Sequence, residues 1–146
     1  MKIDLDYYRK MLDVFLEADA AHIELYDFPK YGVEYVNAQT KELDEQFIFH
    51  FQLLVENNLI SNRNMDSYDL KSLGFSFGAR GDCTLSVIPL RLTQAGHDFA
   101  SSLHNNDVIE KLKSEFKDMP FKVIFEGGQQ LLQHYAKKKL DALLAN

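Results

Sequence analysis

The chain contains a single cysteine, Cys83, so no disulfide can form within one molecule. A chain with so little cysteine fits a reducing compartment, and we expect a cytoplasmic location. No apolar run approaches the roughly 18 residues that a membrane-spanning helix needs. Residues 1–6 are charged and lack the apolar segment of a secretory signal. The sequence therefore predicts a protein without a membrane-spanning segment.

Patterns typical of catalytic and metal sites are also missing. The five histidines show no His-x-x-x-His spacing and have no cluster of cysteines nearby. Glycine loops of the Walker and Gly-x-Gly-x-x-Gly types are absent. His97 and Asp98 are adjacent, but neighbours in a helix point away from each other, so a structural role is expected for His97. We predict that the protein is not an enzyme and uses no cofactor or metal.

Basic side chains are outnumbered, with 16 Lys and Arg against 22 Asp and Glu and a net charge of -6. The net charge is -4 over residues 1–40, -3 over 41–60, 0 over 61–104 and +1 over 105–146. Neutralisation of phosphates supplies most non-specific affinity for DNA. The acidic block over residues 41–60 therefore argues against DNA as a partner.

Hydrophobic residues make up 46% of the chain, which is ample for a packed core. Apolar positions at helical spacing predict a helix over residues 4–18, with Asp4 as its N-cap. Alternating patterns predict short strands over 22–27 and 33–36, separated by a turn at 28–32. Thr40 is expected to cap a second helix that ends at Asn57 and Asn58, since asparagine tolerates a left-handed backbone. The exposed face of this helix is predicted to include Glu42, Glu45, Gln46, His50, Gln52 and Glu56.

After the second helix, Leu59-Ile60 is expected to be extended, and the polar, glycine-bearing residues 61–82 suit a hairpin or loop. A returning strand is predicted over 84–92, with Pro89 at an edge or a bulge. Thr93 is predicted to cap a helix over residues 94–103. A further helix is predicted to start from an N-cap at Asp107, and the last helix to start after Pro120. Gly127 and Gly128 fall inside the last helix and predict a break or a close helix crossing.

This order of helix, turn, hairpin, strand and a helix opened by Leu92-Thr93-x-x-Gly96 is typical of a winged helix-turn-helix domain. We predict an α+β fold in which residues 1–104 form the winged-helix domain with a short β-hairpin wing. Residues 105–146 are predicted to form a C-terminal helical extension, packed on the same domain or at a dimer interface.

Several motifs resemble the uncharacterised domain-of-unknown-function family 2513. The resemblance covers most of the chain and rests on Met1-Lys2-x-Asp4-x-Asp6, His50 with Leu53-Leu54 and Leu59-Ile60, Pro89-x-Arg91-Leu92-Thr93-x-x-Gly96-His97-Asp98-Phe99, Asp107-x-x-x-Lys111 and Lys137-Lys138-Lys139-Leu140. Asn58 stands where glycine usually follows the second helix. The resemblance implies a bacterial or phage-encoded winged-helix protein, often in a prophage-like setting, with no established activity.

A winged helix suggests two sets of DNA-contacting residues. If the helix from Thr40 lies in the major groove, its polar side chains would contact base edges. These candidates are Gln46, His50, Gln52 and Asn57. A basic wing would contact phosphates through Arg63, Lys71, Arg80 and Arg91. A solvated helix face and ordinary loop charge are the open alternatives for the two sets.

Two functions remain open at this point. The first is a non-enzymatic, DNA-binding transcriptional regulator that forms a homodimer through its last helix, with Leu131, Leu132, Tyr135 and Leu140 at the two-fold axis. The alternative is an acidic winged-helix module that binds a basic protein partner and no DNA. The two hypotheses differ in whether the basic candidates and the second helix form one positive face.

Overall fold

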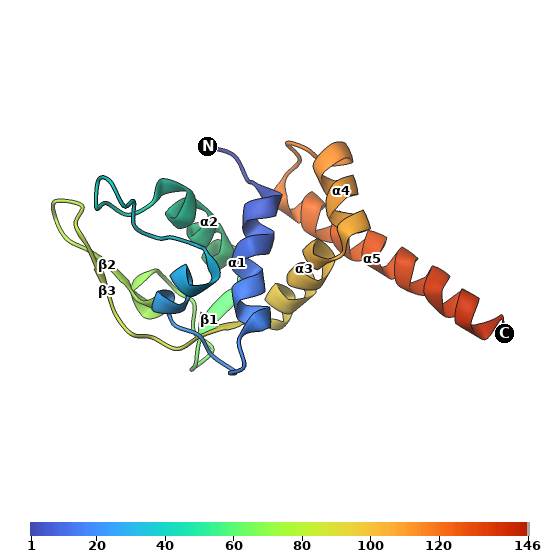
Figure 1. Ribbon diagram of the computed structural model, residues 1–146, viewed down its shortest axis with the longest axis horizontal. Helices are drawn as coiled ribbons and strands as arrows, with labels where there is room; N and C mark the ends of the chain where they lie inside the picture. Colours follow the sequence, from blue (N-terminus) through green and yellow to red (C-terminus); the bar gives the residue numbers. More distant parts are fainter. Residues whose placement is uncertain (146) are drawn as a thin grey trace. The chain divides into compact units, whose positions relative to one another are not determined.

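The computed structural model describes residues 1–145 and shows a mixed α+β fold (Figure 1), which confirms the predicted class. The chain divides into two compact units, one over Ile3–His97 and one from Asp98 onward together with Lys2. The elements in chain order are α1 (Leu5–Glu17), η1 (Leu25–Asp27), η2 (Pro29–Tyr31), α2 (Glu45–Glu56), β1 (Ile60–Asn62), η3 (Lys71–Leu73), β2 (Phe75–Phe77), β3 (Cys83–Leu85), β4 (Leu90–Leu92), α3 (Gln94–His104), α4 (Asn106–Glu115) and α5 (Phe121–Leu144), where η marks a short 3-10 helix. The boundary between the units falls within α3.

Helix α1 begins where the sequence predicts. The side chain of Asp4 accepts a hydrogen bond from the backbone N–H of Tyr7 at 3.1 Å, which satisfies a free donor of the first turn. Tyr8, Met11 and Leu12 lie on one face of the helix and are buried in the core of the first unit.

Helix α2 begins four residues later than predicted, so the assignment of Thr40 as its N-cap is wrong. The side chain of Asn37 accepts the N–H of Thr40 at 3.1 Å and holds it in a turn. Leu43 forms an isolated β-bridge before the helix starts. Asp44 is the actual N-cap, and its carboxylate accepts the N–H of Phe47 at 2.9 Å. A turn stabilised by a nearby side chain therefore displaces the start of the helix.

Hydrogen bonds connect the end of α2 to the start of α3 within the first unit. Asn58 has a φ of 55°, the left-handed conformation that its sequence position predicts. Its carbonyl oxygen accepts the hydroxyl of Thr93 at 2.6 Å, and the Thr93 hydroxyl accepts the N–H of Gly96 at 3.0 Å. A Cβ at Gly96 would overlap the carbonyl oxygen of Leu59. The Leu-Thr-x-x-Gly motif thus encodes a cap and a close backbone approach.

The predicted strands over 22–27 and 33–36 are wrong. Ile23 makes only an isolated bridge to Leu90, and the chain then turns into η1. The N–H of Glu24 donates to the carboxylate of Asp27 at 2.7 Å, and this reciprocal capping favours a helical turn over an extended strand. Val36 likewise makes a single bridge.

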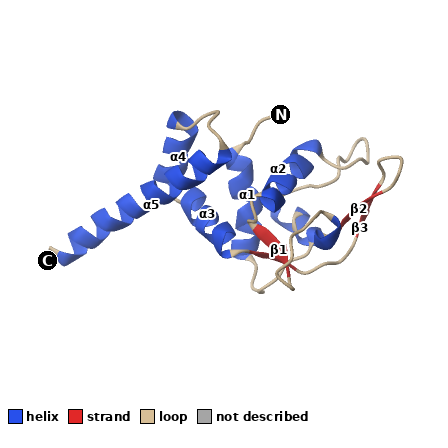
Figure 2. Cartoon of the chain, turned by 180° about the vertical axis from the view of Figure 1, so that it is seen from behind, coloured by secondary structure: helices blue, strands red, loops and turns tan. Residues whose placement is uncertain are grey.

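The predicted strand over 84–92 divides into two strands that belong to different sheets (Figure 2). β3 pairs with β2 in an antiparallel hairpin, with Ser76 opposite Thr84. β4 pairs with β1, also antiparallel, with Ser61 opposite Arg91. Pro89, which has no N–H to donate to a ladder, lies between the two strands.

Aromatic rings form the core of the first unit around Phe47 of α2. Its ring centroid lies 5.2 Å from that of Phe28, 5.6 Å from that of Phe51 and 6.1 Å from that of Phe75. All four rings are buried. α2 is therefore fixed by its inner face, which leaves its opposite face for other contacts.

In the second unit the N-cap of α4 is Asn105, whose side chain accepts the N–H of Val108 at 3.1 Å, so the assignment of Asp107 as N-cap is wrong. α5 continues through Gly127 and Gly128 without a break. A Cβ at Gly127 would lie 2.9 Å from the ring of Phe116, and one at Gly128 would lie 3.3 Å from Leu112. The two glycines therefore serve the close helix crossing that the sequence allows.

Candidate functional site

The outer face of α2 is acidic. Burial of Phe47, Phe51 and Leu54 orients the helix so that Glu45, Gln52 and Glu56 share the exposed side. α2 contains no lysine or arginine. The sequence predicted that these three side chains are exposed, and the structure confirms it.

Two adjoining hollows border this face of α2 and share Gln52 and Phe77. The first has a volume of about 590 Å³ and the second of about 810 Å³. We call the pair the α2 groove. The first hollow is lined by Gln52, Val55, Glu56, Tyr68, Asp69, Leu70, Lys71, Phe75, Ser76 and Phe77. The second is lined by Tyr35, Val36, Lys41, Glu42, Leu43, Glu45, Ile48, Gln52, Phe77, Arg80, Gly81, Asp82, Cys83 and Leu85.

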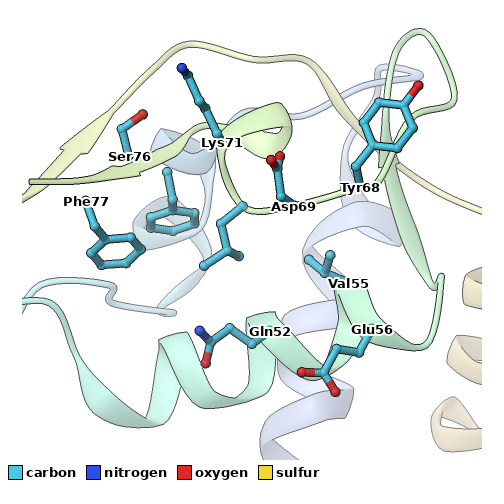
Figure 3. Close-up of a pocket in the computed structure, with 10 residues that line it drawn as sticks. Gln52, Val55, Glu56, Tyr68, Asp69, Lys71, Ser76 and Phe77 are labelled. Carbon is cyan, nitrogen blue, oxygen red and sulfur yellow. The ribbon is translucent and has the colours of Figure 1, made fainter.

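Figure 3 shows the walls of the first hollow, with Gln52 and Glu56 on α2 facing the segment that carries Asp69 and Lys71. Tyr68 is 81% exposed at the rim. Its hydroxyl donates to the carboxylate of Asp66 at 2.9 Å, and this hydrogen bond raises the pKa of Tyr68.

Apolar side chains line the interior of the α2 groove. Phe77 is 48% exposed between the two hollows, and Val55 and Phe75 are buried beside it in the first. Ile48 and Leu43 supply apolar surface to the second. An apolar interior with a polar rim is the usual composition of a recognition groove.

Acidic groups predominate in and around the groove. The two hollows together are lined by five acidic and three basic residues, a net charge of -2. The first unit, Ile3–His97, has fifteen acidic and eight basic residues, a net charge of -7. The electrostatic field at the α2 groove therefore favours a positively charged ligand.

The structure contradicts the predicted exposure of His50. Its side chain is wholly buried, and its Nε2 accepts the backbone N–H of Asp4 at 3.0 Å. Its Nδ1 lies 2.7 Å from the carbonyl oxygen of Gln46 and donates to it. The rings of Tyr7 and Tyr8 pack on the imidazole at centroid distances of 4.7 and 5.0 Å. Both ring nitrogens are thus used inside the fold, and His50 is not available to a base edge.

Burial also lowers the pKa of His50 below its ordinary value of 6.5, against smaller opposing effects of the Gln46 carbonyl and the Asp4 carboxylate. As the pH falls, the unfolded chain therefore binds a proton at His50 at a higher pH than the folded chain does. The contribution of His50 to stability is complete above pH 6.5 and is lost as the pH falls through its folded pKa. We expect the free energy of unfolding, measured with denaturant, to fall between about pH 7.5 and pH 5.

The variant His50→Gln should have a shallower pH dependence over this range. His97→Gln, which removes an exposed histidine of the same unit, serves as the matched control. Identical slopes for all three proteins would contradict the assignment of a neutral, buried His50.

The other three helix candidates have different positions. Gln52 lines both hollows, whereas Gln46 is exposed on α2 outside the residues that line them. Asn57 is the C-cap of α2, and its side chain donates to the carbonyl oxygen of Leu53 at 2.8 Å. Gln52 alone among these candidates contributes to the groove.

Only two of the four basic wing candidates line the groove. Lys71 lines the first hollow and Arg80 the second. Arg63 is exposed, and Arg91 donates from its guanidinium to the hydroxyl of Ser61 at 3.2 Å; neither residue lines a hollow. The groove therefore brings together Gln52, Lys71 and Arg80 with acidic neighbours.

Two groove residues, Tyr68 and Phe77, lie outside the motifs of the sequence. Each is a large aromatic residue in a polar, glycine-bearing segment, and this contrast in composition is the signal that points to them. Their placement opposite α2 depends on how residues 61–85 fold back.

Among residues 1–145, no three His, Cys, Asp or Glu side chains are grouped so that they could hold a metal ion. None of the described helices combines the length and the apolar character needed to cross a membrane. Comparison of the chain with protein-family models, with curated proteins and with solved structures gives no match.

Proposed function

We propose that the first unit is a winged-helix-type domain whose α2 groove binds a basic, amphipathic protein segment and not DNA. The order of α1, the Ile23 bridge, α2, β1, the β2–β3 hairpin and β4 supports the winged-helix assignment. Membership of the domain-of-unknown-function family 2513 is part of the same proposal, because that resemblance implies this fold.

The observation that carries the proposal is the charge of α2. In a winged-helix protein this helix would enter the major groove, and its neighbours would neutralise phosphates. Here Glu45 and Glu56 occupy its outer face without a compensating lysine or arginine on the helix. Two carboxylates directed at a phosphate backbone would be repelled, whereas the same carboxylates attract a basic partner.

The apolar interior of the groove specifies the kind of basic segment. Phe77 and Ile48 provide surface for aliphatic side chains, and the acidic rim provides partners for lysine or arginine. A helix with one apolar and one basic face satisfies both requirements and would lie along α2 in a helix-in-groove mode.

A fluorescence polarisation titration with a labelled, lysine- and leucine-rich amphipathic helical peptide tests this proposal. We expect saturable binding that weakens as salt is added. The double variant Glu45→Gln, Glu56→Gln should bind about tenfold more weakly, a loss of about 1.4 kcal/mol. Binding weakens because the double variant removes both carboxylates that would attract the lysines of the peptide.

The control is the double variant Glu17→Gln, Glu34→Gln, which removes two exposed carboxylates of the same unit outside the residues that line the groove. It should retain the affinity of the natural chain. Equal losses in the two variants would show attraction to net charge only, and an absence of binding would refute the proposed function.

A further inference from the structure

We infer that the α2 groove accepts the C-terminal half of α5 from a second copy of this chain. The inference rests on the proposed function, since it names the occupant of the same groove. It follows from the composition of α5, from its exposed surface and from the charge of the groove.

The first half of α5 is packed in the second unit, whereas residues 136–145 are exposed. Ile124 and Gly128 are buried, and the side-chain amide of Gln129 donates to the hydroxyl of Ser102 at 2.6 Å. From residue 131 to residue 145, where the described chain ends, no residue is buried. Leu140 is 53% exposed and Leu143 is 65% exposed. Figure 1 shows this part of α5 as an uninterrupted helix drawn in red.

The exposed half of α5 is both amphipathic and basic. The partly buried Leu132 and Tyr135 and the exposed Ala136 and Leu143 share one face at helical spacing. Residues 131–144 contain three lysines and one aspartate, a net charge of +2. This is the class of segment that the groove should accept.

The position of Lys139 indicates that α5 binds the α2 groove and not a second α5. Lys139 lies four residues after Tyr135 and four before Leu143, so it falls within the apolar face. Parallel, in-register pairing of two α5 helices through that face would bring the two copies of Lys139 together without a counter-charge on the face. Docking along α2 would instead place Lys139 near Glu45 or Glu56, with Phe77 and Ile48 available to the leucines.

The dimensions of the two elements agree. α2 has 12 residues and is about 18 Å long, and residues 131–144 form about 21 Å of helix. Each copy offers one groove and one α5 end. A reciprocal exchange between two copies therefore gives a closed, two-fold symmetric dimer.

Sedimentation equilibrium of the full chain over a range of concentrations tests this inference. We expect a dimer that dissociates as salt is raised. A groove variant (Glu45→Lys, Glu56→Lys) and a tail variant (Lys137→Glu, Lys138→Glu, Lys139→Glu) should each be monomeric when alone. An equimolar mixture should form a heterodimer, because the groove of one variant and the tail of the other are intact. A chain that carries all five changes should dimerise again.

The control for charge is Lys111→Glu, Lys117→Glu, Lys122→Glu, which alters three exposed lysines of the same unit and should leave the dimer intact. A dimer that persists in the groove variant would indicate α5–α5 pairing and overturn the inference. So would a monomer at all concentrations. If the basic peptide still binds the groove of a monomeric chain, only the identity of the occupant is refuted; loss of peptide binding refutes the proposed function as well.

Discussion

Gly96→Ala is expected to lower the free energy of unfolding by about 3 kcal/mol. The added Cβ would overlap the carbonyl oxygen of Leu59, which is a backbone atom and cannot rotate away. The same oxygen accepts the N–H of Thr93 at 3.0 Å, so its displacement would also weaken the connection between α2 and α3. Equilibrium denaturation followed by circular dichroism measures the loss.

Gly81→Ala provides the comparison for this prediction. A Cβ at Gly81 meets no atom within 4 Å, but its φ of 82° is unfavourable for alanine. It should cost about 1 kcal/mol through the backbone alone. If Gly96→Ala costs no more than Gly81→Ala, the close approach of α3 to Leu59 is contradicted.

Phe47→Ala is expected to be the most destabilising side-chain truncation in α2, with a loss of about 4 kcal/mol in the free energy of unfolding. The ring is wholly buried and contacts Phe28, Phe51 and Phe75, so its removal leaves a cavity that three rigid neighbours cannot fill. Chemical denaturation of the full chain gives the value.

Phe49→Ala makes the same chemical change two residues away on α2, where the ring is half-buried. Its cost should be less than half that of Phe47→Ala. Equal costs would mean that α2 is oriented differently and that the acidic face described here does not face the groove.

Local side-chain chemistry explains which elements were predictable. Asp4 and Thr93 act as N-caps, and Asn58 adopts the left-handed backbone that ends a helix. Each of them acts on residues close to it in the chain, and the structure confirms the three predicted roles. Asp44 and Asn105 are the N-caps of α2 and α4, whereas the sequence favours the nearby Thr40 and Asp107, which suit the same role. The turn before a helix determines which of two nearby polar residues becomes its N-cap. The spacing of apolar residues does not describe that turn.

Long-range packing explains what was not predictable. His50 is polar and lies on a helix with an acidic outer face, and its burial depends on the backbone N–H of Asp4, 46 residues away. The groove likewise requires Phe77 and Tyr68 to fold back onto α2. The sequence predicts the acidic character of α2, whereas the hollows beside it arise only from tertiary structure.

Binding of the intact protein to random-sequence duplex DNA at about 50 mM and 200 mM salt distinguishes a DNA-binding α2 from one that binds a basic protein segment. We expect no retention of DNA at either salt concentration, because the outer face of α2 carries Glu45 and Glu56 and no cation. Retention at low salt that falls steeply at high salt would show that the protein neutralises phosphates. That result would contradict the assignment of the α2 groove to a basic protein segment.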